Sequence, residues 1–320
     1  MATSFFNFLK EGLLLPTRNR RLFLALYAVV AASTALLLLG SDLTIQPLAN
    51  EIQLDAKALN STDPGSPDFA KLVQEIQDDT RELLLVGAGY LLLSVVVTSA
   101  VRIVLLFAAV STYSSEEQPA TFTLGALLGK AKAQLKGPLL TLAFVYVLEI
   151  VCIVLLAFVG ALLGGVLMVT LRKYFMVLLL ASGLLFGAAA VFLVYFSFLC
   201  SFSVVVAVAE PGCHGAAALG RAWRLAKGKR RQVVLYVAVT GALAAILSPV
   251  HTLATTCAGD DDSVALGLLL GFVYAALMAL VQLFAVCAMT AFYYERKEDS
   301  DNQLGATGYA KLSSTEEATA

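Results

Sequence analysis

Charged side chains are scarce in this sequence. They make up 14% of its 320 residues, whereas soluble domains typically carry about 25%. A chain with so few charges lacks the polar surface of a soluble protein, and 59% of its residues are hydrophobic. The formal net charge of −1 gives no reason to expect a nucleic acid as a partner.

Metal-ligating and catalytic patterns are also missing. The five cysteines are far apart and form no CxxC pair, and the adjacent Cys213 and His214 cannot complete a metal site by themselves. This spacing argues against a disulfide framework or a zinc site. No glycine-rich phosphate loop, HExxH, GxSxG or kinase motif occurs. We therefore expect neither a cofactor nor an enzymatic activity.

Long hydrophobic runs are abundant instead. A run of about 20 apolar residues crosses a bilayer as a helix, because backbone polar groups must be paired internally in lipid. The sequence predicts an all-α, polytopic bundle with six spans, at residues 22–40, 83–110, 139–171, 174–209, 233–255 and 264–292. Three spans within residues 139–209 would place Arg172 and Lys173 near mid-bilayer, at about 2.5–3.5 kcal/mol each. We favour two long helices there.

The connections differ in charge. The segments before the first, third and fifth runs are basic, whereas residues 42–82 hold nine acids and three bases. The positive-inside rule then places both termini in the cytosol. The membrane itself is expected to be the endoplasmic reticulum or the plasma membrane. We expect a cytosolic N-terminal tail (1–21), a transmembrane domain (22–292) and a C-terminal tail (293–320) that is disordered because it is polar.

A short amphipathic segment precedes each odd-numbered run. The apolar residues recur at helical spacing, and they are Phe5, Phe6, Leu9 and Leu13, then Leu124, Leu127, Leu128, Ala131 and Leu135, then Leu219, Ala222, Trp223 and Ala226. A basic helix with one apolar face lies in the membrane interface. The pattern predicts three units, each an interfacial helix plus a helical hairpin. The alternative is that any cytosolic flank of a span tends to be basic.

The third of these segments carries a family resemblance. It contains Glu210 and Gly215, followed by Ala218-Leu219, Arg221-Ala222-Trp223, Leu225 and Lys227-Gly228-Lys229. This resembles the "E…G…AL.RSW.L.KG" segment of a broad six-span family, with Ala222 where the family has Ser. The family includes the membrane domain of some bacterial glycerophosphodiester phosphodiesterases and many plant multi-pass proteins, and the layout here looks most like the latter. The resemblance implies a fold and a membrane location but no activity.

Three polar residues fall inside the predicted spans: Arg102, Glu149 and Gln282. They lie about 12–16 Å from the cytosolic ends of their spans at 1.5 Å per residue. A charge at such a depth usually faces the bundle and has a partner. We expect an Arg102–Glu149 pair with Gln282 nearby, which would form a polar gate or substrate contact, or would fix the helix register. In the alternative, Arg102 reaches back to the interface.

Two further features predict sites outside the spans. Six basic residues follow the fourth span and are candidates for contacts with anionic lipid or a cytosolic protein, namely Arg221, Arg224, Lys227, Lys229, Arg230 and Arg231. They alternatively only set the topology. The sequon Asn60-Ser61-Thr62 lies in the acidic connection, near Pro64 and Pro67, and predicts N-glycosylation of Asn60.

Two functions fit these observations. The first is a non-enzymatic membrane scaffold, adaptor or membrane-organising protein. The second is a transporter or channel for a small or lipid-like substrate, which usually has broken helices and a polar cluster at the midplane. Arg102, Glu149 and Gln282 are a small set for such a cluster, so we favour the first.

Overall fold

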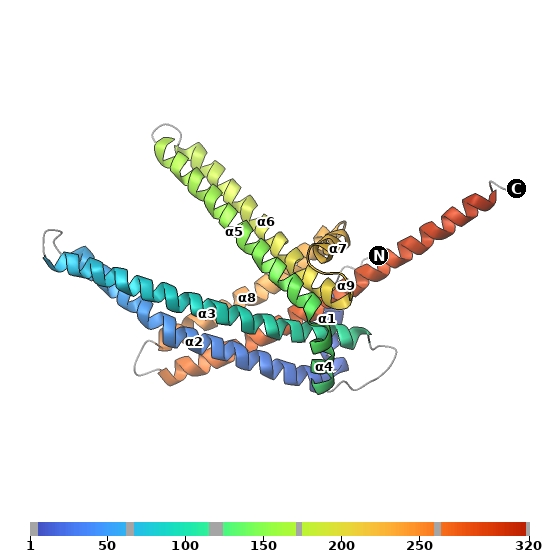
Figure 1. Ribbon diagram of the computed structural model, residues 1–320, viewed down its shortest axis with the longest axis horizontal. Coiled ribbons are helices and arrows are strands. Elements are labelled where there is room, and N and C mark those ends of the chain that lie inside the picture. Colours follow the sequence, from blue (N-terminus) through green and yellow to red (C-terminus); the bar gives the residue numbers. More distant parts are fainter. Residues whose placement is uncertain (1–5, 62–66, 115–123, 171–174, 259–263, 318–320) are drawn as a thin grey trace. The chain divides into compact units, whose positions relative to one another are not determined.

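A computed structural model describes residues 6–61, 67–114, 124–170, 175–258 and 264–317 (Figure 1). The described residues contain helices and no strand. The helices are α1 (Asn7–Arg18), α2 (Arg20–Ser61), α3 (Pro67–Ser114), α4 (Leu124–Gln134), α5 (Lys136–Thr170), α6 (Phe175–Ala209), α7 (Ala216–Ala226), α8 (Arg230–Ala258) and α9 (Val264–Glu317). A short helix followed by two long ones therefore occurs three times, in the order that the threefold pattern predicts.

Six of these helices are long and apolar enough to cross a membrane: α2, α3, α5, α6, α8 and α9. They correspond one to one to the six predicted runs, so the prediction of an all-α polytopic bundle is confirmed. Residues 139–209 form two helices, α5 and α6, as expected from the cost of burying Arg172 and Lys173. Those two residues themselves lie outside the described ranges.

The chain divides into two compact units. Unit 1 comprises residues 1–22, 104–242 and 284–320, and unit 2 comprises residues 23–103 and 243–283. Several of the long helices contribute residues to both units. Each unit is described by itself below.

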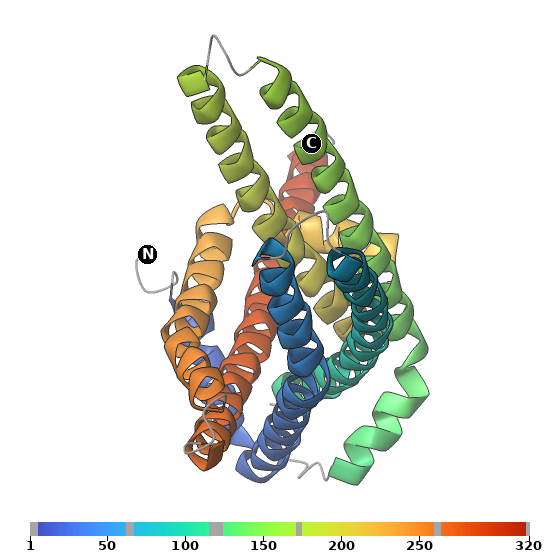
Figure 2. The same cartoon turned by 90° about the vertical axis from the view of Figure 1, so that its left-hand side faces the viewer.

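Unit 2 contains a hairpin of α2 and α3, which run side by side in both views (Figure 1, Figure 2). Half-buried positions recur along both helices at steps of three and four residues, as at Leu72, Ile76, Asp79, Leu83, Val86 and Tyr90. This spacing is that of a helix pair with a narrow packed seam. Tyr90 joins the two helices, because its hydroxyl donates to the carbonyl oxygen of Leu37.

The hairpin extends well beyond the predicted spans. α2 has 42 residues, about 63 Å at 1.5 Å per residue, against a hydrocarbon core of about 30 Å. The predicted acidic connection is helical as far as Ser61 and again from Pro67. Its composition explains this difference, since residues 48–59 are mostly Leu, Ala, Glu, Gln and Lys, which favour helix. The Asp42–Gln46 hydrogen bond (2.9 Å), one turn apart, adds local support.

Unit 1 contains a second hairpin, of α5 and α6, which contact each other over part of their length (Figure 1, Figure 2). Large apolar side chains on both helices are exposed, including Val154, Leu155, Leu184, Phe186 and Val191. A soluble protein would not present such a surface to water, so these side chains face lipid.

The core of unit 1 is aromatic. Phe202 has no exposed surface and lies beside Phe292 at 5.4 Å and Tyr293 at 6.4 Å between ring centroids. Phe292 also contacts Phe8 of α1 edge-on at 5.6 Å. Aromatic pairs of this geometry stabilise beyond the area they bury. Helices α1, α6 and α9 therefore meet at these rings.

The C-terminal boundary differs from the predicted one. α9 continues through the expected disordered tail to Glu317. Tyr293 has no exposed surface, and Arg296 bonds to the carbonyl oxygen of Leu225 at 3.0 Å. The polar residues after the last span thus begin as a packed part of unit 1, because their side chains find partners on α7.

A glycine marks the closest approach of α1 to α9. A Cβ on Gly12 would lie 2.6 Å from Ala288 Cα and 2.7 Å from Ala288 N. Backbone cannot move aside as a side chain can, so we expect Gly12→Ala to lower the free energy of unfolding by about 1–3 kcal/mol. The measurement is thermal unfolding of the purified protein in detergent.

Gly220→Ala is the matched control. A Cβ there meets nothing within 4 Å, and alanine is favoured over glycine inside a helix by roughly 0.5–1 kcal/mol. Its melting temperature should equal or exceed that of the natural protein. If Gly12→Ala melted at the same temperature as Gly220→Ala, the α1–α9 contact would be incorrect.

Candidate functional site

The turn between α6 and α7 fixes the position of α7. Gly215 has φ of 58°, a left-handed conformation that costs little only for glycine. Its amide donates to Thr141 Oγ1 at 2.9 Å, and the Thr141 hydroxyl donates to the carbonyl oxygen of Gly137 at 3.0 Å. Thr141 has no exposed surface. A buried hydroxyl on α5 therefore holds the start of α7.

One face of α7 packs on the bundle, chiefly against α6. The buried residues are Ala218, Ala222, Leu225 and Ala226, and their small side chains allow close approach. The predicted apolar face comprised Leu219, Ala222, Trp223 and Ala226, so the face in contact with protein is rotated from it. Trp223 is 49% exposed and points away from the core.

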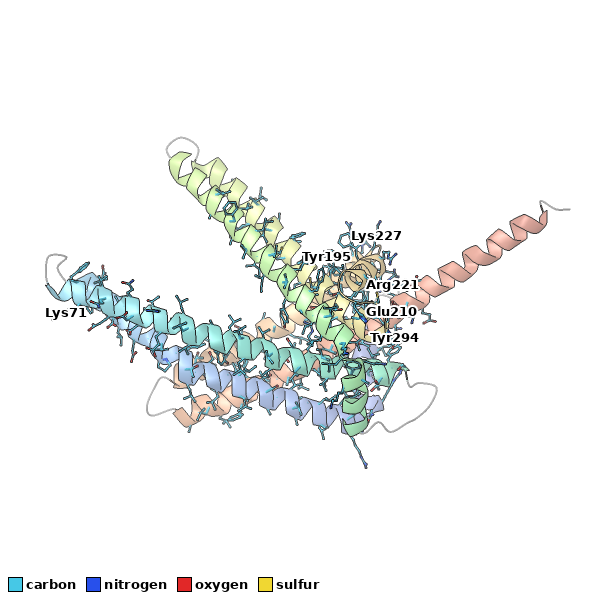
Figure 3. All side chains as sticks on the ribbon, in the orientation of Figure 1. Lys71, Tyr195, Glu210, Arg221, Lys227 and Tyr294 are labelled. Atoms are coloured by element: carbon cyan, nitrogen blue, oxygen red, sulfur yellow. The ribbon has the colours of Figure 1, made fainter. Side chains whose placement is uncertain are left out.

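Glu210, Arg221 and Tyr293 form a polar cluster at the base of α7, here called the Glu210 cluster. The Tyr293 hydroxyl donates to Glu210 Oε1 at 2.9 Å, and Arg221 Nε lies 3.4 Å from the same oxygen. The Arg221 contact is an ion pair without hydrogen-bond geometry at Nε. Figure 3 shows Glu210 and Arg221 close together, beside Tyr294. One carboxylate thus joins the end of α6 to α7 and α9.

A second set of polar contacts joins the other end of α7 to α9. Arg296 Nε donates to the carbonyl oxygen of Leu225 at 3.0 Å, and its NH1 donates to Asp299 Oδ2 at 2.8 Å. Lys229 Nζ lies 3.6 Å from the same Asp299 oxygen. The last carbonyl groups of a helix have no partner within it, and Arg296 supplies one.

The six predicted lipid-contacting residues therefore separate into two groups. Arg221 forms an ion pair with half-buried Glu210, and Lys229 forms one with Asp299, whose side chain is 47% exposed. The other four are exposed: Arg224, Lys227, Arg230 and Arg231. In Figure 3, Lys227 lies on the opposite side of α7 from Glu210. Contact of these six residues with anionic lipid or a cytosolic protein stays a prediction, and the sequence order does not reveal that two of them have carboxylate partners.

Trp223 lies beside these exposed cations. Its ring contacts Tyr195 of α6 edge-on, with 6.1 Å between centroids and an interplanar angle of 82°. Tryptophan prefers the boundary between hydrocarbon and water, because its ring is apolar and its N–H is polar. Trp223, Arg224, Lys227, Arg230 and Arg231 together are here called the α7 surface.

The structure assigns the predicted intramembrane residues to different units. Arg102 and Gln282 belong to unit 2, whereas Glu149 belongs to unit 1. Within unit 1, Ser197 of α6 donates to Glu149 Oε1 at 3.5 Å. Glu149 thus lies at the packed α5–α6 seam, and all three residues are half-buried. The Arg102–Glu149 pair stays a prediction.

Asn60 is exposed in the last turn of α2. Thr62, the third sequon residue, lies outside the described ranges. Glycosylation of Asn60 stays a prediction.

The structure places each of the two histidines, His214 and His251, at the wall of a cavity. In unit 2, His251 and Asp42 line a cavity of about 50 Å³. A single water needs roughly 10–15 Å³ by this measure, so the cavity holds a few waters at most. In unit 1, His214 lines a cavity of about 200 Å³ together with Lys136 and Gln134. Each histidine is far in sequence from the polar residues that share its cavity, so no local sequence motif predicts these groupings.

The described residues offer few candidates for a metal site or a redox-active disulfide. Within them, no group of three or more His, Cys, Asp or Glu side chains is placed to hold a metal ion. All five cysteines are free thiols.

Six membrane-spanning helices, lipid-facing apolar surfaces and a basic short helix define an integral membrane protein with an all-α polytopic bundle. The chain belongs to the family described as Domain of unknown function (DUF8558), whose profile matches residues 2–303. Searches of the curated proteins and of the solved structures gave no match. Neither the plant origin nor the similarity to glycerophosphodiester phosphodiesterases is supported by these comparisons.

The Glu210 cluster gives a direct test of how α7 is held. Tyr293→Phe removes the hydroxyl that donates to Glu210 and leaves the carboxylate less satisfied. Loss of one hydrogen bond to a charged group typically costs about 1.5–3 kcal/mol. We expect the melting temperature in detergent to fall accordingly.

Tyr195→Phe serves as the control, since the phenylalanine ring preserves the contact with Trp223. It should melt within error of the natural protein. Equal melting of the two variants would show that the Tyr293–Glu210 hydrogen bond contributes nothing to stability.

Proposed function

We propose that this protein is a non-enzymatic membrane-organising protein whose α7 surface binds anionic lipid headgroups on the cytosolic side. The observation that carries the proposal is the arrangement of α7. Its inner face packs on the bundle, while Trp223 and four basic residues remain exposed. A basic helix with an interfacial tryptophan is typical of contact with an anionic membrane surface.

Electrostatics makes this contact strong enough to matter. Each Lys or Arg near an anionic surface contributes about 1 kcal/mol, so four contribute about 4 kcal/mol at most. Arg221 and Lys229 contribute less, because Glu210 and Asp299 neutralise them. The ion pairs orient α7 and the exposed cations bind lipid.

The proposal includes a topology with both termini in the cytosol of a cell, in the endoplasmic reticulum or plasma membrane, and with Asn60 as a glycan acceptor on the opposite side. It does not depend on the resemblance of residues 210–229 to the phosphodiesterase-linked membrane domain, which stays a prediction. Helices α1 and α4 precede spans as α7 does, and we infer that they also lie in the interface.

Trp223 provides the measurement for lipid binding, because it is the only tryptophan in the chain. The full chain is reconstituted in phosphatidylcholine nanodiscs that contain phosphatidylserine, with bromine on one lipid or the other. Brominated phosphatidylserine should quench Trp223 more than its bulk fraction predicts, and this excess measures the local enrichment of phosphatidylserine around Trp223. In the quadruple variant Arg224→Gln, Lys227→Gln, Arg230→Gln, Arg231→Gln, we expect this enrichment to fall by about tenfold, well within the ~4 kcal/mol available.

The control is a triple variant, Lys57→Gln, Lys71→Gln, Arg81→Gln, which removes exposed cations of α2 and α3. It should keep the full enrichment. Raising the salt concentration should weaken the enrichment in the natural protein, since the Debye length is about 8 Å at physiological salt. Identical quenching by both brominated lipids in the natural protein would refute the proposal.

The topology has its own test. When the chain is made in cells with a eukaryotic secretory pathway, we expect Asn60 to be glycosylated. Removal of glycan should increase the gel mobility of the natural protein and leave Asn60→Gln unchanged. A sequon engineered into residues 111–120 should remain unmodified, and glycan there would invert the orientation.

A further inference from the structure

We propose that the cavity of unit 1 lined by Lys136 and His214 is a binding site for a phosphate group. This cavity, here called the Lys136 cavity, lies where α4 meets α5 and where α6 turns into α7. It is separate from the α7 surface, and none of that surface's residues lines it.

The volume and lining of the cavity suit a small anion. It measures about 200 Å³, well above the roughly 10–15 Å³ that one water needs. Among the described residues, its polar lining consists of Lys136, Gln134 and His214, and no carboxylate lines it. An ammonium group, an amide and an imidazole together can donate several hydrogen bonds to phosphate oxygens. Lysine is a common phosphate ligand and acts as a compact point charge.

His214 shows an unmet hydrogen-bonding need at this site. Its Nδ1 atom is buried and has no hydrogen-bond partner within the described part of the chain. The ring is pressed against Gly137, where an added Cβ would lie 2.2 Å from its Cε1 atom. A buried polar atom without a partner costs free energy. The same ring lines the cavity, which offers room for a ligand or a water beside it.

The walls of the cavity are fixed in advance. Thr141 binds Gly215 and Gly137 at once, so it ties the turn that carries His214 to the first turn of α5. Pro138 and Pro211 also line the cavity and limit backbone motion. A site held rigid in this way loses little conformational entropy on binding.

The position of the cavity makes it accessible to two sources of phosphate. Much of its lining comes from the first residues of α5, the last residues of α6 and the turn that follows α6, where both apolar runs stop. Phosphate headgroups occupy this depth in a bilayer, and basic pockets between spans commonly bind them. A soluble phosphate compound reaches the same depth from water. Both sources present the same chemistry to Lys136.

The test uses the full chain in neutral detergent and follows its melting temperature as inorganic phosphate is added at constant ionic strength. Phosphate should stabilise the natural protein, and acetate should not. In Lys136→Gln, the apparent Kd for phosphate should rise by about tenfold or more, the loss expected for one charged hydrogen bond. Lys132→Gln is the matched control, since Lys132 is exposed on α4 and does not line the cavity. It should respond as the natural protein does.

A second arm separates the two sources. The same variants are melted in phosphatidylcholine nanodiscs that contain either phosphatidic acid or an equal charge of phosphatidylserine. Stabilisation that appears only with phosphatidic acid, and that Lys136→Gln removes, assigns the site to a lipid headgroup. Stabilisation by inorganic phosphate, removed by the same change, shows that a free phosphate is sufficient. If Lys136→Gln does not fold, His214→Gln replaces it.

Three results would overturn the phosphate site: no stabilisation in either arm, equal stabilisation by acetate, or equal responses of Lys136→Gln and Lys132→Gln. The quadruple α7 variant distinguishes this proposal from the proposed function. It should keep the phosphate response in detergent even though it loses lipid enrichment. Loss of the phosphate response in that variant would mean that the α7 surface, and not the cavity, binds the anion.

Discussion

Backbone amides and carbonyls find no water inside a bilayer, and the rest of this structure follows from that constraint. Each group must be paired within its own segment, so every span is a helix. The exposed leucines, valines and phenylalanines of α5 and α6 then need no protein partner, because lipid covers them. Packing is concentrated elsewhere, in the aromatic core of unit 1 and in the seam between α2 and α3.

Polar contacts are placed where the spans end. Glu210 receives both Tyr293 and Arg221, and Arg296 binds the last turn of α7. Each contact joins helices that are distant in sequence, so together they determine which face of α7 packs and which remains free. The α7 surface is a consequence of this arrangement, since Glu210 pairs with Arg221 and Asp299 pairs with Lys229 and Arg296, whereas the cations of the α7 surface are exposed.

The sequence predicted the helical class, the number of spans and their order, because long apolar runs have a single stable form in lipid. It also predicted the short helices before the odd-numbered spans. It misjudged the extent of α2, α3 and α9. Residues 42–61 and 293–300 are polar enough to look like connection or tail, but they are good helix formers or have partners on other helices, as Arg296 does on α7.

Sequence alone thus determined what crosses the membrane, since that depends on composition over about 20 residues. Tertiary structure decided which charges are free. Arg221 and Arg224 are three residues apart and chemically identical, but within the described ranges only Arg221 has a carboxylate partner. The same holds for His214, whose ring meets Gly137 and lines one cavity with Lys136 only after α5, α6 and α7 have packed. Side-chain contacts between distant segments depend on how each helix is rotated and on the turns that precede it. For α7, the positive φ of Gly215 and its hydrogen bond to Thr141 fix the turn at the start of the helix.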